Sequence, residues 1–193
     1  MALVRTAAWA IGIVYATIPS YWLMVHPRAR LWESRGGKRL IAVGPLWLLT
    51  WVVAGAITWP WRRLLLYSIV WTWAPGTVLI LAGLIIYVFA HQDFTTDQVL
   101  GRSELQPQKH QQRLATGGIR AKVRHPYYLG HLAELLGWSI GTGLAVLYGL
   151  AVFAVVTGYF MVRAEERELE QRFGQAYRDY KATTPALIPG RKA

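Results

Sequence analysis

Two short polar clusters flank a long apolar stretch in the second half of the chain. The first is Arg124-His125-Pro126, and the second is Glu165-Glu166, with Arg163 just before it. Arginine holds anionic groups through paired hydrogen bonds, whereas carboxylate and imidazole groups bind cations or take up protons. If the intervening stretch folds back on itself, both clusters would form one site at a membrane surface. A water-soluble cofactor could meet a lipid-soluble acceptor there.

The apolar stretch is too long for one membrane crossing. Residues 127 to 162 number 36, and one helix of that length would extend about 54 Å at about 1.5 Å per residue, against a hydrocarbon core of about 30 Å. Gly141-Thr142-Gly143 is the natural turn, because glycines disfavour helix and accept positive φ angles. The first hairpin helix, residues 127 to 140, is therefore short and should lean on the bundle. His131 and Glu134 share one of its faces, where we expect a buried hydrogen-bonded pair rather than a metal site.

The residues beside the hairpin suggest how each cluster is used. Pro126 suits the first position of the following helix, whose free N–H groups would favour an anion. Arg124 could hold the same anion with two hydrogen bonds, or simply bind phospholipid head groups. Beyond Val162 we predict an amphipathic cytoplasmic helix. Glu165 and Glu166 point about 100° apart on it, so one of them should face the Arg-His-Pro end; solvated ion pairs are the alternative.

Composition sets these clusters in a membrane. The chain is 54% apolar with a mean hydropathy of +0.26, which is high for a soluble domain of 193 residues. Its 21 Lys and Arg outnumber 10 Asp and Glu, but they are spread over the segments between apolar runs, which favours a membrane topology over a nucleic-acid partner. The absence of cysteine excludes disulfides, thiolate metal sites and a cysteine nucleophile.

We therefore predict an all-α integral membrane protein, a single membrane domain over residues 1–193 with about five transmembrane helices. N-terminal spans occupy residues 1–99, and a cofactor-binding loop, the hairpin and the C-terminal helix occupy 100–193. The predicted spans are residues 7 to 25, 41 to 59, 75 to 90 and the two hairpin helices, with 61 to 74 either interfacial or part of the third span. The basic segments 26–40, 91–125 and 163–193 carry five, six and seven Lys or Arg. Alternation puts all three on one side, which should be cytoplasmic.

The same residues resemble a known family, the isoprenylcysteine carboxyl methyltransferases and phospholipid methyltransferases. The resemblance covers roughly residues 100 to 190. It is carried, in order, by Leu114-x-x-x-Gly118-Ile119, Arg124-His125-Pro126-x-Tyr128-x-Gly130, the hairpin, Glu165-Glu166, Phe173-Gly174-x-x-Tyr177-x-x-Tyr180 and Pro185-x-x-Ile188-Pro189.

This resemblance implies a membrane methyltransferase that uses S-adenosylmethionine. The cofactor-binding residues it implies are Gln112, Arg113, Leu114, Ala115, Arg120, His125, Pro126, Tyr127, Tyr128 and Glu165. Three positions depart from the family pattern: Gln112 replaces a histidine, Arg120 a tyrosine, and Met161 an arginine that contacts the prenylated substrate. Arg163 is the candidate to replace that arginine, although the shift turns the side chain by about 200°. Arg163 and Glu166 are thus the predicted catalytic residues.

The sequence does not identify the methyl acceptor. A lipid or another hydrophobic small molecule would enter from the membrane, and the oligomeric state is undetermined. A carboxylate acceptor needs no base, whereas an amine must first be neutral, and Glu166, His125 and His131 are the candidate bases. Two other functions compete with the methyltransferase. One is a sterol-type membrane reductase that binds NADPH, and the other is a non-catalytic scaffold whose loops bind anionic lipid.

Overall fold

The structure is a bundle of helices. The computed structural model describes residues 1–28, 39–92 and 114–190, and every regular element in these ranges is helical, as predicted. The six α-helices are α1 (Ala2–Val25), α3 (Arg39–Thr58), α4 (Trp73–Gln92), α7 (Pro126–Thr142), α8 (Ala145–Phe173) and α9 (Gln175–Thr183), and the 3-10 turns are η1 (His26–Arg28), η2 (Trp59–Trp61), η3 (Val70–Thr72) and η4 (Gly118–Ala121).

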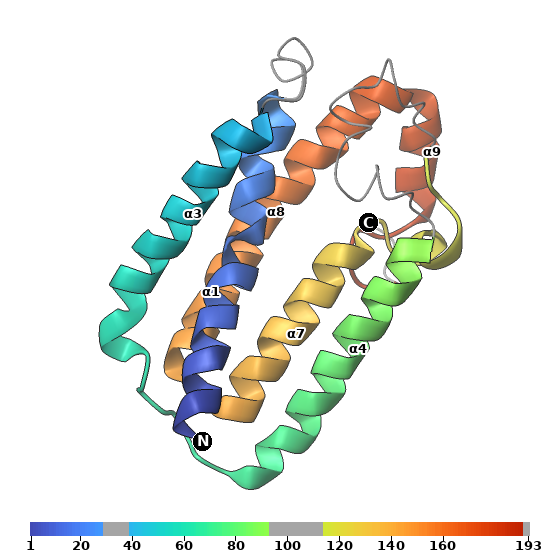
Figure 1. Ribbon diagram of the computed structural model, residues 1–193. Coiled ribbons are helices and arrows are strands. Elements are labelled where there is room, and N and C mark those ends of the chain that lie inside the picture. Colours follow the sequence, from blue (N-terminus) through green and yellow to red (C-terminus); the bar gives the residue numbers. More distant parts are fainter. Residues whose placement is uncertain (29–38, 93–113, 191–193) are drawn as a thin grey trace.

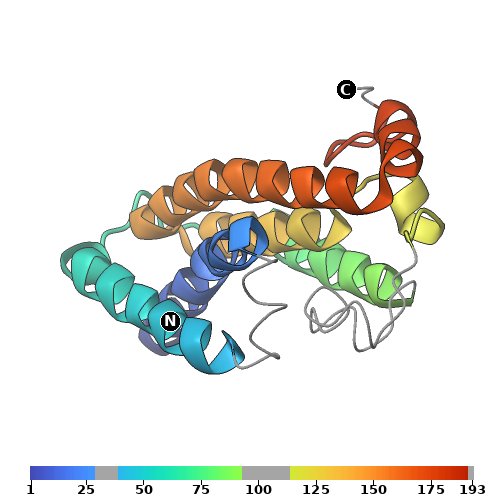
Figure 2. The same cartoon turned by 90° about the horizontal axis from the view of Figure 1, so that it is seen from above.

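The long helices lie side by side, and α7 is the central one (Figure 1). It packs against α4, α8 and α1, while α1 also contacts α3. Figure 2 shows α3 and α4 at opposite edges of the bundle. Their large apolar side chains point outward, as expected of helices that face lipid; examples are Leu48, Val52, Leu81 and Ile85.

Four helical segments within the described ranges are long and apolar enough to cross a membrane. They are Ala2–Val25, Val43–Trp61, Val70–Gln92 and Ala145–Phe173. The remaining long helix, α7, has 17 residues and buries Glu134 and Ser139. It is the short, inward-packed first arm of the hairpin that the sequence predicts.

The connection between α3 and α4 pairs with the hairpin turn. After η2 the chain becomes extended, and Leu65 forms an isolated antiparallel bridge with Leu144. The N–H of Leu66 donates to the carbonyl of Gly143 at 2.9 Å, and the N–H of Ala145 donates to the carbonyl of Leu64 at 3.0 Å. Gly143 has φ 68°, which explains why glycine ends α7 there. Residues 64 to 69 therefore belong to the connection, and α4 begins only at Trp73.

Glycines allow α4 and α7 to approach closely. A Cβ atom on Gly83 would lie 2.8 Å from the carbonyl oxygen of Gly130, and one on Gly137 would lie 2.6 Å from the carbonyl oxygen of Gly76. Helices in membranes associate mainly through such close backbone packing, because lipid provides no hydrophobic driving force between them. The four glycines thus fix the distance between the two helices.

The polar clusters lie at one end of the bundle. The C-terminal ends of α1, α4 and α8 and the first turn of α7 share this end, which α9 also caps (Figure 1). The N-terminus, the connection between α3 and α4, and the 141–143 turn lie at the other end. The hairpin therefore returns Glu165 and Glu166 to the level of Arg124 and His125.

The α4–α7 packing predicts the effect of a single methyl group. Gly137→Ala should force the two helices apart, at a cost of about 1–3 kcal/mol for overpacking. The melting temperature in detergent should then fall by several degrees. Gly149→Ala on α8 is the matched control, because a Cβ there meets no atom within 4 Å. Equal melting temperatures for the two variants would contradict the packing described.

Candidate active site

Arg124 and Glu166 form a buried ion pair between the segment just before α7 and the C-terminal part of α8. The Nε and Nη2 of Arg124 donate to Glu166 Oε1 at 2.9 and 2.6 Å. Its Nη1 donates to the backbone carbonyls of Lys181 and Thr184. Both side chains are more than nine-tenths buried. All three guanidinium nitrogens thus have partners within the protein, which fix the position of Arg124.

His125 lies between the two carboxylates. Its Nδ1 is 3.2 Å from Glu165 Oε2, and its Nε2 is 3.2 Å from Glu166 Oε1. Burial alone would lower the pKa of His125, but the charge of Glu165 and the hydrogen bonds to both carboxylates raise it to about 9. The imidazole is therefore protonated at neutral pH and donates from both nitrogens. Both glutamates face the Arg-His-Pro cluster, whereas the sequence predicts only one.

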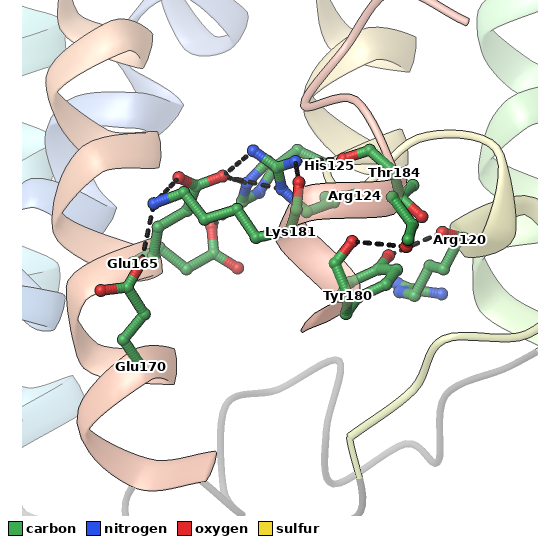
Figure 3. Close-up of polar contacts among 10 residues, drawn as sticks. Arg120, Arg124, His125, Glu165, Glu170, Tyr180, Lys181 and Thr184 are labelled. Atoms are coloured by element: carbon green, nitrogen blue, oxygen red, sulfur yellow. Dashed lines mark hydrogen bonds and ion pairs between the residues drawn. The ribbon is translucent and has the colours of Figure 1, made fainter. Parts of the chain in front are cut away.

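The C-terminal segment, residues 181 to 186, contacts this network (Figure 3). Lys181 on α9 lies 3.0 Å from Glu166 Oε2 and 2.7 Å from Glu170 Oε1. The N–H groups of Arg124 and His125 donate to the carbonyls of Pro185 and Ala186 at 2.9 and 3.0 Å. The C-terminal segment therefore completes the hydrogen bonding of the Arg-His-Pro cluster.

The C-terminal helix differs from its prediction. The sequence suggests one amphipathic helix beyond Val162, but α8 continues as far as Phe173 and then breaks at Gly174, which has φ 57°. This positive φ is readily adopted by glycine alone. After the break, α9 turns back and buries Tyr177 against the bundle.

A cavity of about 330 Å³ lies beside this network. Its walls come from α1 and η1, from the segment before α7, from the first turns of α7, and from α8. The residues that line it are Ile18, Pro19, Trp22, His26, Arg120, Arg124, His125, Pro126, Tyr127, Tyr128, His131, Met161 and Glu165. The lining combines charged and aromatic side chains with apolar ones. The wall from α1 has no counterpart in the sequence prediction, since its residues are ordinary for a membrane span.

The cavity brings together most of the predicted cofactor residues. Six of the ten line it: Arg120, His125, Pro126, Tyr127, Tyr128 and Glu165. Leu114 and Ala115 are half-buried and do not line it. Gln112 and Arg113 lie outside the described residues.

The two predicted catalytic residues are not cavity residues. Arg163 is exposed and donates from Nη2 to the Tyr159 hydroxyl at 2.7 Å. Glu166 is held by Arg124, His125 and Lys181. Arg163 therefore does not take the place of the family arginine in this cavity, whereas Met161, at that arginine's own position, does line it.

His131 and Glu134 on α7 do not bond to each other. The Tyr15 hydroxyl donates to Glu134 Oε2 at 2.6 Å, and His131 Nδ1 lies 2.7 Å from the Tyr127 carbonyl oxygen. The prediction that His131 and Glu134 form a hydrogen-bonded pair is therefore wrong, because each side chain bonds to another group. His131 faces the cavity, while Glu134 is buried among the helices.

Tyr128 fixes the distance between the hairpin arms at the cavity. Its hydroxyl donates to the carbonyl of Ala154 on α8 at 2.5 Å. The tyrosine lies so close to Gly158 that a Cβ there would be 1.7 Å from the hydroxyl oxygen. Tyr128 thus lies in the wall of the cavity and also anchors α7 to α8.

The chain matches the model of a known protein family. A family model described as "Phospholipid methyltransferase" matches residues 71–176. The chain is similar to Protein-S-isoprenylcysteine O-methyltransferase of Rattus norvegicus, with 30% identity over 138 residues, which cover 69% of this chain and 45% of that protein.

Two further relatives are named for other substrates. Methanethiol S-methyltransferase 1 of Bradyrhizobium diazoefficiens is 32% identical over 101 residues, which cover 51% of this chain and 32% of that protein. Delta(14)-sterol reductase of Mus musculus is 32% identical over 78 residues, which cover 39% of this chain and 19% of that protein. The chain spans less than half the length of these relatives. No solved structure matches it significantly.

The His125 network predicts a pH dependence of stability. The folded pKa of about 9 exceeds the unfolded value of about 6.5, so this stabilisation is complete below about pH 6.5 and is lost as the pH rises through 9. The melting temperature should therefore fall between pH 7 and pH 9.5. His125→Gln should flatten that decline, since Glu165, Glu166, Arg124 and Lys181 keep their charges over most of the window. An identical decline in both proteins would rule out this origin.

Proposed function

Since the chain belongs to the phospholipid methyltransferase family, we propose that it transfers a methyl group from S-adenosylmethionine to a lipid-like or other hydrophobic acceptor. The observation that carries this proposal is the cavity itself. Arg124, His125 and Glu165 give the cavity polar lining groups, and Ile18, Pro19 and Met161 give it apolar ones. Donor and acceptor of unlike polarity could therefore be held together in one enclosed space.

The polar side of the cavity fits a cationic donor. Glu165 Oε2 is paired with His125, and Oε1 has no partner among the described residues, so the carboxylate can still accept from a cationic group. The rings of Trp22 and Tyr127 offer faces for a planar base. In the first turn of α7 the N–H groups of Tyr127 and Tyr128 have no acceptor within the helix and suit a carboxylate. Glu165, Trp22 and Tyr127 would thus hold S-adenosylmethionine, which supplies an activated methyl group on a sulfonium.

The apolar side favours an acceptor from the bilayer. Ile18 and Pro19 on α1 and Met161 on α8 line it, and all three positions lie on helices that cross the membrane. A hydrophobic acceptor can reach such a wall without passing through water. Exclusion of water also strengthens the electrostatic interactions that hold the reacting groups in line.

The active end of the bundle faces the cytoplasm in this proposal. The excess of Lys and Arg in 26–40, 91–125 and 163–193 supports that orientation. The cytoplasm would then supply the soluble donor, and the membrane would supply the acceptor.

A reductase is the second candidate, and the similarity to a sterol reductase is the observation that favours it. It requires NADPH in the same cavity. The two ligands differ in charge: the α-ammonium group of the donor, which S-adenosylhomocysteine shares, would be a cation beside Glu165, whereas NADPH has phosphates and no ammonium group. A non-catalytic scaffold would bind neither molecule.

Titration of the detergent-purified protein with S-adenosylhomocysteine and with NADPH tests the proposal. The wild-type protein should bind the first and not the second. Glu165→Gln should weaken S-adenosylhomocysteine binding by about 10- to 100-fold, the range for a hydrogen bond to a charged group. Glu170→Gln is the control, because Glu170 lies on the same helix but outside the cavity. Binding of NADPH alone would favour the reductase, and equal affinities of the two variants would remove Glu165 from the donor site.

A further inference from the structure

The end of the bundle opposite the cavity carries positive charge without a counter-charge. The N-terminus of α1, the connection between α3 and α4, and the hairpin turn lie at this end (Figure 1). Their charged side chains are Arg5, Arg62 and Arg63, and the only acidic residue among the first 92 is Glu33, which comes after α1. None of the three arginines forms an ion pair within the described residues. This end of the protein is therefore suited to an anionic ligand.

Aromatic contacts bring two of these arginines to one place. Arg5 and Trp9 are one turn apart on α1. The ring of Trp9 lies 5.6 Å from the ring of Trp59 between centroids, and its N–H donates to the Thr58 hydroxyl at 2.9 Å. The guanidinium carbon of Arg62 lies 3.5 Å from the centroid of the Trp59 ring. Arg5 and Arg62 therefore adjoin the same pair of tryptophans.

Most hydrogen-bond donors of these two arginines remain available. Arg5 Nη2 donates to the Ser68 hydroxyl at 2.8 Å, and Arg62 Nη1 donates to the Trp59 carbonyl at 2.6 Å. Each guanidinium has five N–H donors, and neither makes another hydrogen bond within the described ranges. A small cavity of about 30 Å³ lies against Arg5, Ser68 and Thr142. This cavity has room for an oxygen atom of a bound group.

The surrounding side chains place these donors at the level of lipid head groups. Trp59 and Trp71 are 54% and 83% exposed. Leu64 and Leu66 are also exposed, whereas Leu65 between them packs against the core. Exposed tryptophans are typical of the boundary between membrane and water, and exposed leucines beside them face the acyl chains. An anion bound at this level is therefore part of a membrane lipid.

We propose that Arg5 and Arg62 bind the phosphate of an anionic phospholipid in the leaflet opposite the cavity. Guanidinium groups bind phosphate oxygens through paired hydrogen bonds. A lipid with net negative charge is favoured over a zwitterionic one, because these segments have no carboxylate to meet an amine on the head group.

This lipid differs from the proposed methyl acceptor in its position. It lies at the other end of the bundle from the cavity, so its binding does not depend on methyl transfer or on S-adenosylmethionine. Its phosphate links α1 to the connection between α3 and α4, through Arg5 on the first and Arg62 on the second.

The test uses phosphatidylglycerol that carries a photoreactive group near its head group. It is added to the detergent-purified protein in about 0.3 M salt, which screens general attraction between lipid and surface charges. Irradiation should label residues 1–9 and 59–72. Unlabelled phosphatidylglycerol should displace this label, whereas phosphatidylcholine and inorganic phosphate at the same concentration should not.

Single substitutions identify the arginines that bind the lipid. Arg5→Gln and Arg62→Gln should each weaken the competition by phosphatidylglycerol about 10-fold or more, the range for a hydrogen bond between charged groups. Arg63→Gln is the matched control. It removes the same charge from the neighbouring position, where Arg63 is exposed and has no partner among the described residues, so its effect should stay below about threefold under screening.

Four outcomes would overturn the inference. Absence of label from both segments would remove the site, and equal losses in Arg62→Gln and Arg63→Gln would reduce it to general charge attraction. Displacement by phosphatidylcholine as effective as that by phosphatidylglycerol would remove the preference for an anionic lipid. Displacement by inorganic phosphate would identify a soluble anion as the ligand. The competition in the wild-type protein decides these points even where a variant fails to fold.

Discussion

The site depends on one buried ion pair, Arg124 with Glu166. A guanidinium and a carboxylate that leave water lose several kcal/mol of hydration each, and only well-formed hydrogen bonds offset this loss. Here the offset comes from three separate parts of the chain: the segment before α7, the C-terminal part of α8, and the C-terminal segment with Lys181 and Thr184, whose carbonyls accept from Arg124. Loss of either partner would leave an uncompensated buried charge, at a cost of about 3–5 kcal/mol. The pair thereby holds the cavity walls together.

The same pair helps to fix the charge states of the groups around the cavity. Because Arg124 and Lys181 neutralise Glu166, and His125 is held as an imidazolium between two carboxylates, these groups are fixed in one charge state. Glu165 keeps one oxygen with no partner among the described residues. The close contact of Tyr128 with Gly158 fixes the separation of the two hairpin arms that carry these groups.

The sequence predicts the hairpin well because the constraint is simple. A 36-residue apolar stretch exceeds the membrane thickness, and the glycines at 141 and 143 leave one place to turn. Six residues that line the cavity could be predicted, because they lie in or beside short motifs at both ends of that hairpin. The α1 wall could not be predicted, since it depends on contacts between distant segments, whereas the break at Gly174 is marked by the glycine itself. The orientation of Arg163 could not be predicted either. Its place in the sequence suggested a substitute for the family arginine, but its side chain pairs with Tyr159 on the outside of α8.

The central claim is that the methyl donor lies between the first turn of α7 and Glu165, beside the Arg124–Glu166 pair. Ultraviolet cross-linking of S-adenosylmethionine carrying a radioactive methyl group, followed by peptide mapping, tests it most directly. The label should fall in residues 125–131 or 161–165, and excess S-adenosylhomocysteine should suppress it. Label confined to α3 or to the 59–72 connection at the opposite end of the bundle, or label that excess S-adenosylhomocysteine does not reduce, would contradict the account.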